Sequence, residues 1–109
     1  RFLNYMEWKN IRYGCYDITV SSSSHIQFEG KFLKQFGRPY KFVRLRHTNF
    51  AVHRIIAKAF CTGYKKGYVV NHLDGNKRNN RANNLEYCSS IDNIIHAHRL
   101  GLCKKGSRV

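Results

Sequence analysis

Histidine and asparagine side chains crowd one stretch of the second half of the chain, between positions 71 and 96. A neutral imidazole can take a proton from water near neutral pH. Amide oxygens are hard ligands that suit Mg²⁺, an ion that keeps several of its waters and binds few protein groups. A base, an activated water and positive charge on the phosphate are what hydrolysis of a phosphodiester bond requires. His72 is therefore a candidate base, and Asn71 and Asn93 are candidate metal ligands.

Regular elements must position these side chains. The pattern predicts a short strand, a polar turn-rich loop, a return strand and a helix, over residues 68–70, 73–84, 85–88 and 91–99. Neighbours on a strand point to opposite faces. Asn71 as a metal ligand and His72 as a base can therefore act at one site only if the backbone departs from regular geometry at the strand end. The helix is expected to carry Asn93 on its first turn.

The ends and the buried side of that last helix are also predicted. Ser89 or Ser90 is expected to cap its first turn, and Gly101 to stop it. The apolar spacing predicts a buried side made of Ile91, Ile94 and Ile95.

The first half of the chain is expected to be rich in strands, because apolar and polar residues alternate at 16–20, 26–28 and 40–46. In the last of these, Val43 and Leu45 would face one way, and Arg44 and Arg46 the other. A sheet that faces DNA and an ordinary sheet with solvent-exposed arginines both fit this pattern.

A second helix is predicted over residues 50–61, capped by Asn49. Its apolar stripe, expected in the core, consists of Val52, Ile55, Ile56, Ala59 and Phe60. Arg54 and Lys58 lie one turn apart and off this stripe. His53 lies beside the stripe and is expected to be packed and hydrogen-bonded rather than catalytic.

Net charge favours a polyanionic partner. The chain has 20 Lys and Arg against 6 Asp and Glu, a formal net charge of +14, and a small domain repels itself at such a charge. Nucleic acid is favoured over a membrane, because no basic amphipathic helix and no long apolar span is evident. The candidate DNA contacts are Arg44, Arg46, Arg54, Lys58, Lys77, Arg78 and Arg81.

The four cysteines, at positions 15, 61, 88 and 103, show no CxxC spacing. No structural zinc is expected. Reduced, mostly buried cysteines in an intracellular protein, in the cytoplasm or nucleus, are the expectation.

Several motifs follow one another in a fixed order. They are Val52-His53-Arg54-Ile55-Ile56-Ala57-Lys58-Ala59-Phe60, the run from Val69 to Asn76, Asn79-Asn80-Arg81, Asn83-Asn84-Leu85-Glu86, and Ser90-Ile91-Asp92-Asn93 with His96-Ala97. This series covers about residues 50–98 and resembles the HNH homing endonucleases of phage and intron type. The resemblance implies a ββα-metal (His-Me finger) motif, in which two strands and a helix hold one divalent ion. Together with the strands and the helix predicted upstream, this gives an α+β fold in which a small N-terminal antiparallel sheet and a helix precede the motif.

The same resemblance implies roles for single residues. The three letters of the motif fall on His72, Asn84 and Asn93. His72 would be the general base, and Asn84 would hold the loop backbone and the imidazole in orientation. Asn93 and Asn71 would hold one divalent ion, with Mg²⁺ favoured and Mn²⁺ possible. The family often has Asp or His at the position of Asn71, and a neutral amide binds Mg²⁺ more weakly.

His96, one turn beyond the motif's last residue, is a candidate to support a ligand or bind phosphate. The implied partner is double-stranded DNA, cut by a monomer or a homodimer, in a protein that a virus or mobile element could encode. We expect one domain over 1–109, with a β-rich part at 1–48, the helix and nuclease core at 49–100 and a basic tail at 101–109. A DNA-binding module without catalysis and an RNA-binding domain that stacks bases on aromatic side chains are the alternatives.

Overall fold

The computed structural model describes residues 6–101. Its elements in chain order are β1 (Trp8–Tyr13), β2 (Tyr16–Ser21), β3 (Ile26–Phe28), β4 (Lys31–Phe32), β5 (Phe42–Leu45), β6 (Thr48–Ala51), α1 (Val52–Phe60), β7 (Val69–His72), the 3-10 turn η1 (Ala82–Asn84), β8 (Leu85–Cys88) and α2 (Ser90–Arg99). Strands β1 to β4 form an antiparallel meander in sequence order. Two further antiparallel hairpins, β5–β6 and β7–β8, complete the strands. The architecture is α+β, as predicted.

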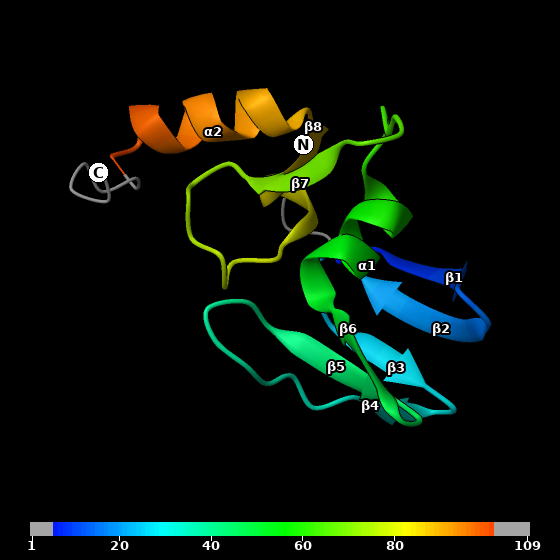
Figure 1. The fold of residues 1–109 in the computed structure, drawn as a ribbon. Coiled ribbons are helices and arrows are strands. Elements are labelled where there is room, and N and C mark those ends of the chain that lie inside the picture. Colours follow the sequence, from blue (N-terminus) through cyan, green and yellow to red (C-terminus); the bar gives the residue numbers. More distant parts are fainter. Residues whose placement is uncertain (1–5, 102–109) are drawn as a thin grey trace.

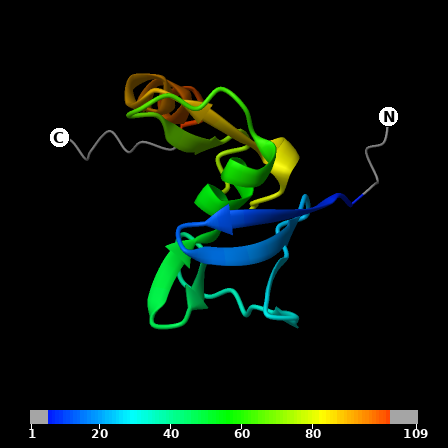
Figure 2. The same cartoon turned by 90° about the vertical axis from the view of Figure 1, so that its right-hand side faces the viewer.

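Helix α1 is the central element. Both views place it between the N-terminal strands and the β7–β8 hairpin (Figures 1 and 2). Helix α2 lies on the outer side of that hairpin and contacts β7 (Figure 1). The N-terminal half therefore supports α1, and α1 supports the hairpin that carries the histidine and asparagine cluster.

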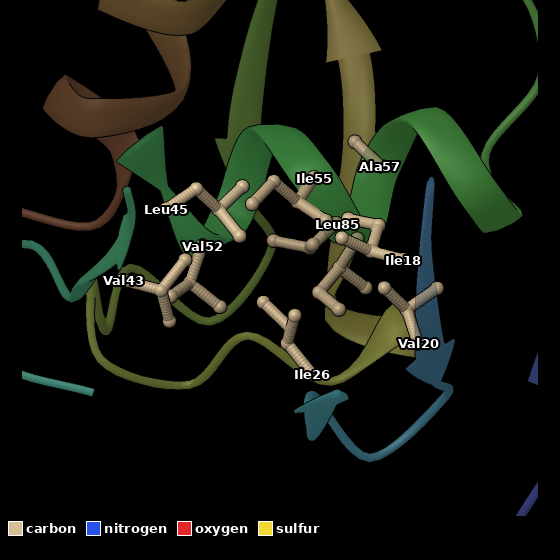
Figure 3. Close-up of a cluster of buried hydrophobic side chains, with 10 residues drawn as sticks. Ile18, Val20, Ile26, Val43, Leu45, Val52, Ile55, Ala57 and Leu85 are labelled. Carbon is tan, nitrogen blue, oxygen red and sulfur yellow. The ribbon is translucent and has the colours of Figure 1, made fainter. Parts of the chain in front are cut away.

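The hydrophobic core forms where α1 meets the strands. Its fully or almost fully buried members, most of them drawn in Figure 3, are Ile18, Val20, Ile26, Val43, Leu45, Val52, Ile55, Ile56, Ala57 and Leu85. Burying one aliphatic side chain of this size stabilises a fold by roughly 1.5–3 kcal/mol. The predicted stripe of α1 is confirmed, with Val52, Ile55 and Ile56 buried and Arg54 and Lys58 exposed.

The start of α1 differs from the prediction. The helix begins at Val52 after the extended residue Ala51, which makes no side-chain cap. Asn49 belongs to β6, where its Oδ1 accepts a hydrogen bond from Nη1 of Arg44 at 3.3 Å. Because the β5–β6 hairpin runs directly into the helix, the pairing of its strands takes the place of a capping side chain.

The buried side predicted for α2 is wrong. Ile91, Ile94 and Ile95 are 70%, 54% and 42% exposed. The half-buried residues of α2 lie on another face, at positions 93, 96 and 97. Ser89 does cap the helix, since its Oγ accepts a hydrogen bond from the amide of Asp92 at 3.1 Å. The hairpin thus meets the polar flank of the helix rather than its isoleucines.

Two smaller expectations are also corrected. Arg46 is not on a strand face, because it lies in the β5–β6 turn with φ of 60° and pairs with Glu29 at 2.7 Å. Of the described cysteines, Cys15 is exposed, while Cys61 and Cys88 are only partly buried; all of these are free thiols. Cys103 and most of the predicted basic tail lie outside the described residues. Among residues 6–101, no helix is long and apolar enough to cross a membrane.

Candidate active site

The β7–β8 hairpin carries both residues at the start of the candidate motif. Asn71 pairs with Glu86 and His72 with Leu85, so regular strand pairing continues to the end of β7. Both residues are therefore paired across the hairpin, and the backbone leaves the strand directly after His72, where Leu73 begins the loop. Both side chains are buried, at 5% and 6% exposure, and they have separate partners.

Asn71 is oriented by the opposite strand. Its Nδ2 donates a hydrogen bond to Oε2 of Glu86 at 2.9 Å. An amide that uses its NH₂ group in this way keeps its oxygen available as a hard ligand. Glu86 is exposed and is the acidic group in contact with a candidate ligand; sequence reasoning did not assign it to the site.

His72 is held by the loop and by two rings. Its Nε2 lies 2.7 Å from Oδ1 of Asn80, a side chain that is 2% exposed. Its ring centroid lies 5.4 Å from that of His53 and 6.1 Å from that of Tyr40. Sequence reasoning missed Asn80, because the loop at 73–84 has five asparagines and spacing alone does not tell which one turns inward.

Asn84 organises the loop rather than touching the imidazole. Its Oδ1 accepts from the amide of Asp74 at 3.0 Å, and its Nδ2 donates to Oδ1 of Asp74 and to the carbonyl of Asn79, each at 2.9 Å. Its backbone carbonyl also accepts from the amide of Leu73 at 2.7 Å. The buried amide of Asn84 therefore ties both ends of the loop together.

Asn84→Ala is expected to lower the free energy of unfolding by roughly 1–3 kcal/mol, because buried loop groups lose their partners. Asn83→Ala is the matched control: its side chain is exposed in the same turn and should leave stability nearly unchanged. Urea unfolding monitored by circular dichroism measures both. Equal stability of the two variants would show that the Asn84 bonds do not hold the loop.

Asp74 lies in the turn that opens the predicted loop. Its carboxylate accepts from the side chain of Asn79, the amide of Asn76 and the side chain of Asn84, and these bonds hold the pKa of Asp74 below its usual range. The carboxylate is thus committed to the loop, consistent with a turn residue rather than a ligand.

His53 is packed, as predicted, but it lacks the predicted hydrogen bond. Its ring lies 4.9 Å from that of Tyr40, and within the described part of the chain its buried Nδ1 has no partner. Burial, together with the nearby His72 and Arg54, lowers the pKa of His53 from 6.5 to about 4. His53 is therefore a neutral neighbour of His72 near neutral pH.

This depressed pKa predicts a pH dependence of stability. In the unfolded chain the imidazole takes up a proton near pH 6.5, while in the fold it does so only near pH 4. The free energy of unfolding should therefore be fully present above about pH 6.5 and should fall, by on the order of 1–2 kcal/mol, as the pH drops toward 4. His53→Phe, which keeps a ring against Tyr40, should flatten this slope in urea unfolding between pH 4 and 7. Asp74 also reduces the free energy of unfolding in acid, but this loss occurs at lower pH, because the pKa of Asp74 in the fold is depressed from 3.8. An unchanged slope in the variant would contradict this assignment.

Helix α2 brings the remaining predicted residues to the hairpin. Asn93 is half-buried and lines a groove of about 980 Å³. His96 lies one turn later, and its Nε2 is 3.0 Å from the carbonyl oxygen of Leu73, the first residue after β7. His96 therefore fastens α2 to the start of the loop.

The groove combines aromatic and basic walls. Tyr40, His53 and Arg54 border it near the histidine pair, and Lys58 lies further along α1. Its other tyrosines are Tyr13, Tyr64, Tyr68 and Tyr87. Positive charge and a concave surface at one place are what a polyanionic ligand requires.

The other basic candidates divide into engaged and exposed groups. Nη1 of Arg78 donates to the carbonyl of Gly37 at 2.6 Å, and Arg46 is paired with Glu29. Nζ of Lys77 lies 5.4 Å from the ring centroid of Tyr40, which places this cation close to the histidine pair. Arg81 is exposed beside the loop.

The site consists of a two-stranded hairpin, an asparagine-rich loop and a facing helix, which together carry an imidazole and amides. This is the architecture of one class of nuclease. The HNH endonuclease family model matches residues 50–94. The chain is thus related to the HNH endonucleases, and the resemblance predicted from its motifs is confirmed.

Particular relatives support this relationship. The chain is 36% identical over 97 residues to the DNA endonuclease I-HmuI of Bacillus phage SP01, an alignment that covers 82% of this chain and 56% of the relative. It is 40% identical over 76 residues to YosQ, a prophage protein of Bacillus subtilis named among the HNH homing endonucleases; this covers 63% of the chain and 44% of YosQ. The chain therefore spans about half the length of these relatives.

A solved structure extends the match to the fold. The structure described as DNA binding and cleavage by the HNH homing endonuclease I-HmuI superimposes with a TM-score of 0.80 at 32% sequence identity. It covers 93% of this chain, and this chain covers 63% of it. The N-terminal sheet and α1 are therefore part of the shared fold, together with the ββα element.

Proposed function

We propose that this protein is a divalent-metal-dependent endonuclease that hydrolyses phosphodiester bonds of double-stranded DNA. One observation carries the proposal: His72 lies buried at the end of β7, beside a groove with basic walls, and the match to an HNH homing endonuclease structure covers 93% of this chain. The relatives from a phage and a prophage support a mobile-element origin.

His72 is the proposed general base. The ring nitrogen that is not bonded to Asn80 takes a proton from the attacking water. Asn84 acts indirectly, by holding the loop that carries Asn80. Arg54, Lys58 and Lys77 are the cations best placed to bind neighbouring phosphates.

The donor set fits Mg²⁺. Asn71, with its NH₂ group committed to Glu86, and Asn93 on the first turn of α2 would hold the ion through their amide oxygens. Within residues 6–101, no cluster of three or more His, Cys, Asp or Glu side chains forms an alternative site. When bound, the ion stabilises negative charge on the scissile phosphate and on the departing oxygen.

A plasmid-nicking assay tests this function. Supercoiled DNA incubated with the protein and Mg²⁺ or Mn²⁺ should be converted to open-circle or linear form, and EDTA should abolish the conversion. If the protein shifts the plasmid in a gel but does not cut it with either metal, it is a DNA-binding module without catalysis. The neutral side chain of Asn71, at a position where the family often has an acid, is the observation that favours this alternative. Preference for single-stranded RNA over duplex DNA in a competition experiment would contradict the proposed substrate.

A further inference from the structure

Asn80 is the most deeply buried side chain of the loop between β7 and β8. It is 2% exposed, and its Oδ1 lies 2.7 Å from Nε2 of His72. An amide oxygen can only accept a hydrogen bond, so in this arrangement Nε2 carries the proton and donates it. A neutral imidazole has one N–H, and the lone pair therefore resides on Nδ1.

We infer that Asn80 is a positioning residue that fixes the tautomer of His72, holding the proton on Nε2 and presenting Nδ1 as the atom that accepts a proton from water. This inference rests on the proposed function for its catalytic meaning. The tautomer itself is a property of the folded chain and can be measured without activity.

The unpaired half of the amide supports a role beyond packing. Among the described residues, Nδ2 of Asn80 is buried and has no hydrogen-bond partner. A buried donor without a partner is destabilising, and a leucine of similar volume would avoid that cost. The contact that Leu would lose is the one between Oδ1 and the imidazole.

The surrounding bonds explain how Asn80 is held in place. The carbonyl of Asn79, the preceding residue, accepts from Nδ2 of Asn84 at 2.9 Å. The side chain of Asn84 also forms two hydrogen bonds with Asp74 at the opposite end of the loop. The motif implied that Asn84 orients His72. In the structure Asn84 holds the loop, and Asn80 on that loop contacts the imidazole of His72.

The direct test is ¹⁵N nuclear magnetic resonance of the histidine rings in the whole chain without metal, above pH 7. Correlations between the ring nitrogens and carbon-bound protons distinguish an Nε2–H from an Nδ1–H imidazole, and His72→Gln assigns the signal. We expect His72 to be in the Nε2–H form. An Nδ1–H form would mean that the amide of Asn80 donates instead, and it would overturn the inference.

Variants then separate positioning from loop stability. Asn80→Leu should release the tautomer preference of His72 and lower kcat for DNA nicking on the order of 10–100-fold, with KM nearly unchanged. Asn80→Asp keeps an acceptor at the same place and should restore the Nε2–H form and most of kcat. Asn79→Ala is the matched control, since it removes a bond to Asp74 in the same loop but leaves Asn80 intact.

The outcomes are distinguishable from failure of the proposed function. If the wild-type chain does not cut DNA, the tautomer measurement still decides the role of Asn80. If Asn80→Leu leaves both the tautomer and kcat unchanged, or if Asn79→Ala changes the tautomer as much as Asn80→Leu does, Asn80 is not the positioning residue.

Discussion

His72→Ala is expected to lower kcat for DNA cleavage by roughly 10²–10⁴-fold, the usual cost of losing a general base. Affinity for DNA should stay nearly unchanged, because the His72 side chain is 6% exposed and the cations that bind phosphate are on other residues. Single-turnover nicking gives the rate, and a gel-shift titration in EDTA gives the affinity.

His98→Ala is the matched control for this experiment, since His98 is exposed on the last turn of α2. It should cut at the wild-type rate. Far-ultraviolet circular dichroism confirms that each variant is folded. If His72→Ala cut DNA as fast as the wild type, the assignment of the base would be wrong.

DNA binding is expected to fall steeply with salt. A formal net charge of +14 and the exposed cations along the groove imply that several phosphates are neutralised together. A protein that contacts 6–10 phosphates loses about 10³–10⁵-fold in affinity between roughly 50 and 200 mM salt. Fluorescence anisotropy with a labelled duplex, titrated at a series of salt concentrations, measures the slope.

Single substitutions locate the contacts. Arg54→Ala and Lys58→Ala should each reduce the slope of log affinity against log salt by about 1. Arg46→Ala is the contrasting variant, because Arg46 is already paired with Glu29 and should change the slope much less. A shallow slope for the wild type, or an equal effect of all these variants, would contradict a binding surface along α1.

Local patterns predicted the parts of the fold that local physics decides. The stripe of α1 was readable because one face of that helix meets the core along its whole length. The hairpin strand at 85–88 was readable because turn residues bound it. The buried face of α2 was not, because the hairpin packs on the flank that bears Asn93 and His96 instead of on the isoleucines.

The candidate site shows the same division. The motif order pointed to His72, Asn84 and Asn93, which all lie on the hairpin, its loop or the facing helix. It did not single out Asn80 or Glu86, because their contacts depend on how the loop turns and on cross-strand register. Residue types predicted the chemistry, whereas the partners of each side chain required three-dimensional structure.

The central claim is that one divalent ion binds between β7 and α2, next to His72. Anomalous diffraction from a crystal of this chain soaked in Mn²⁺ tests it most directly. The expected result is a single strong peak within coordination distance of the amide oxygens of Asn71 and Asn93 and next to the imidazole of His72. A peak elsewhere, or a refined structure in which these two amides are too far apart to share an ion, would contradict the claim.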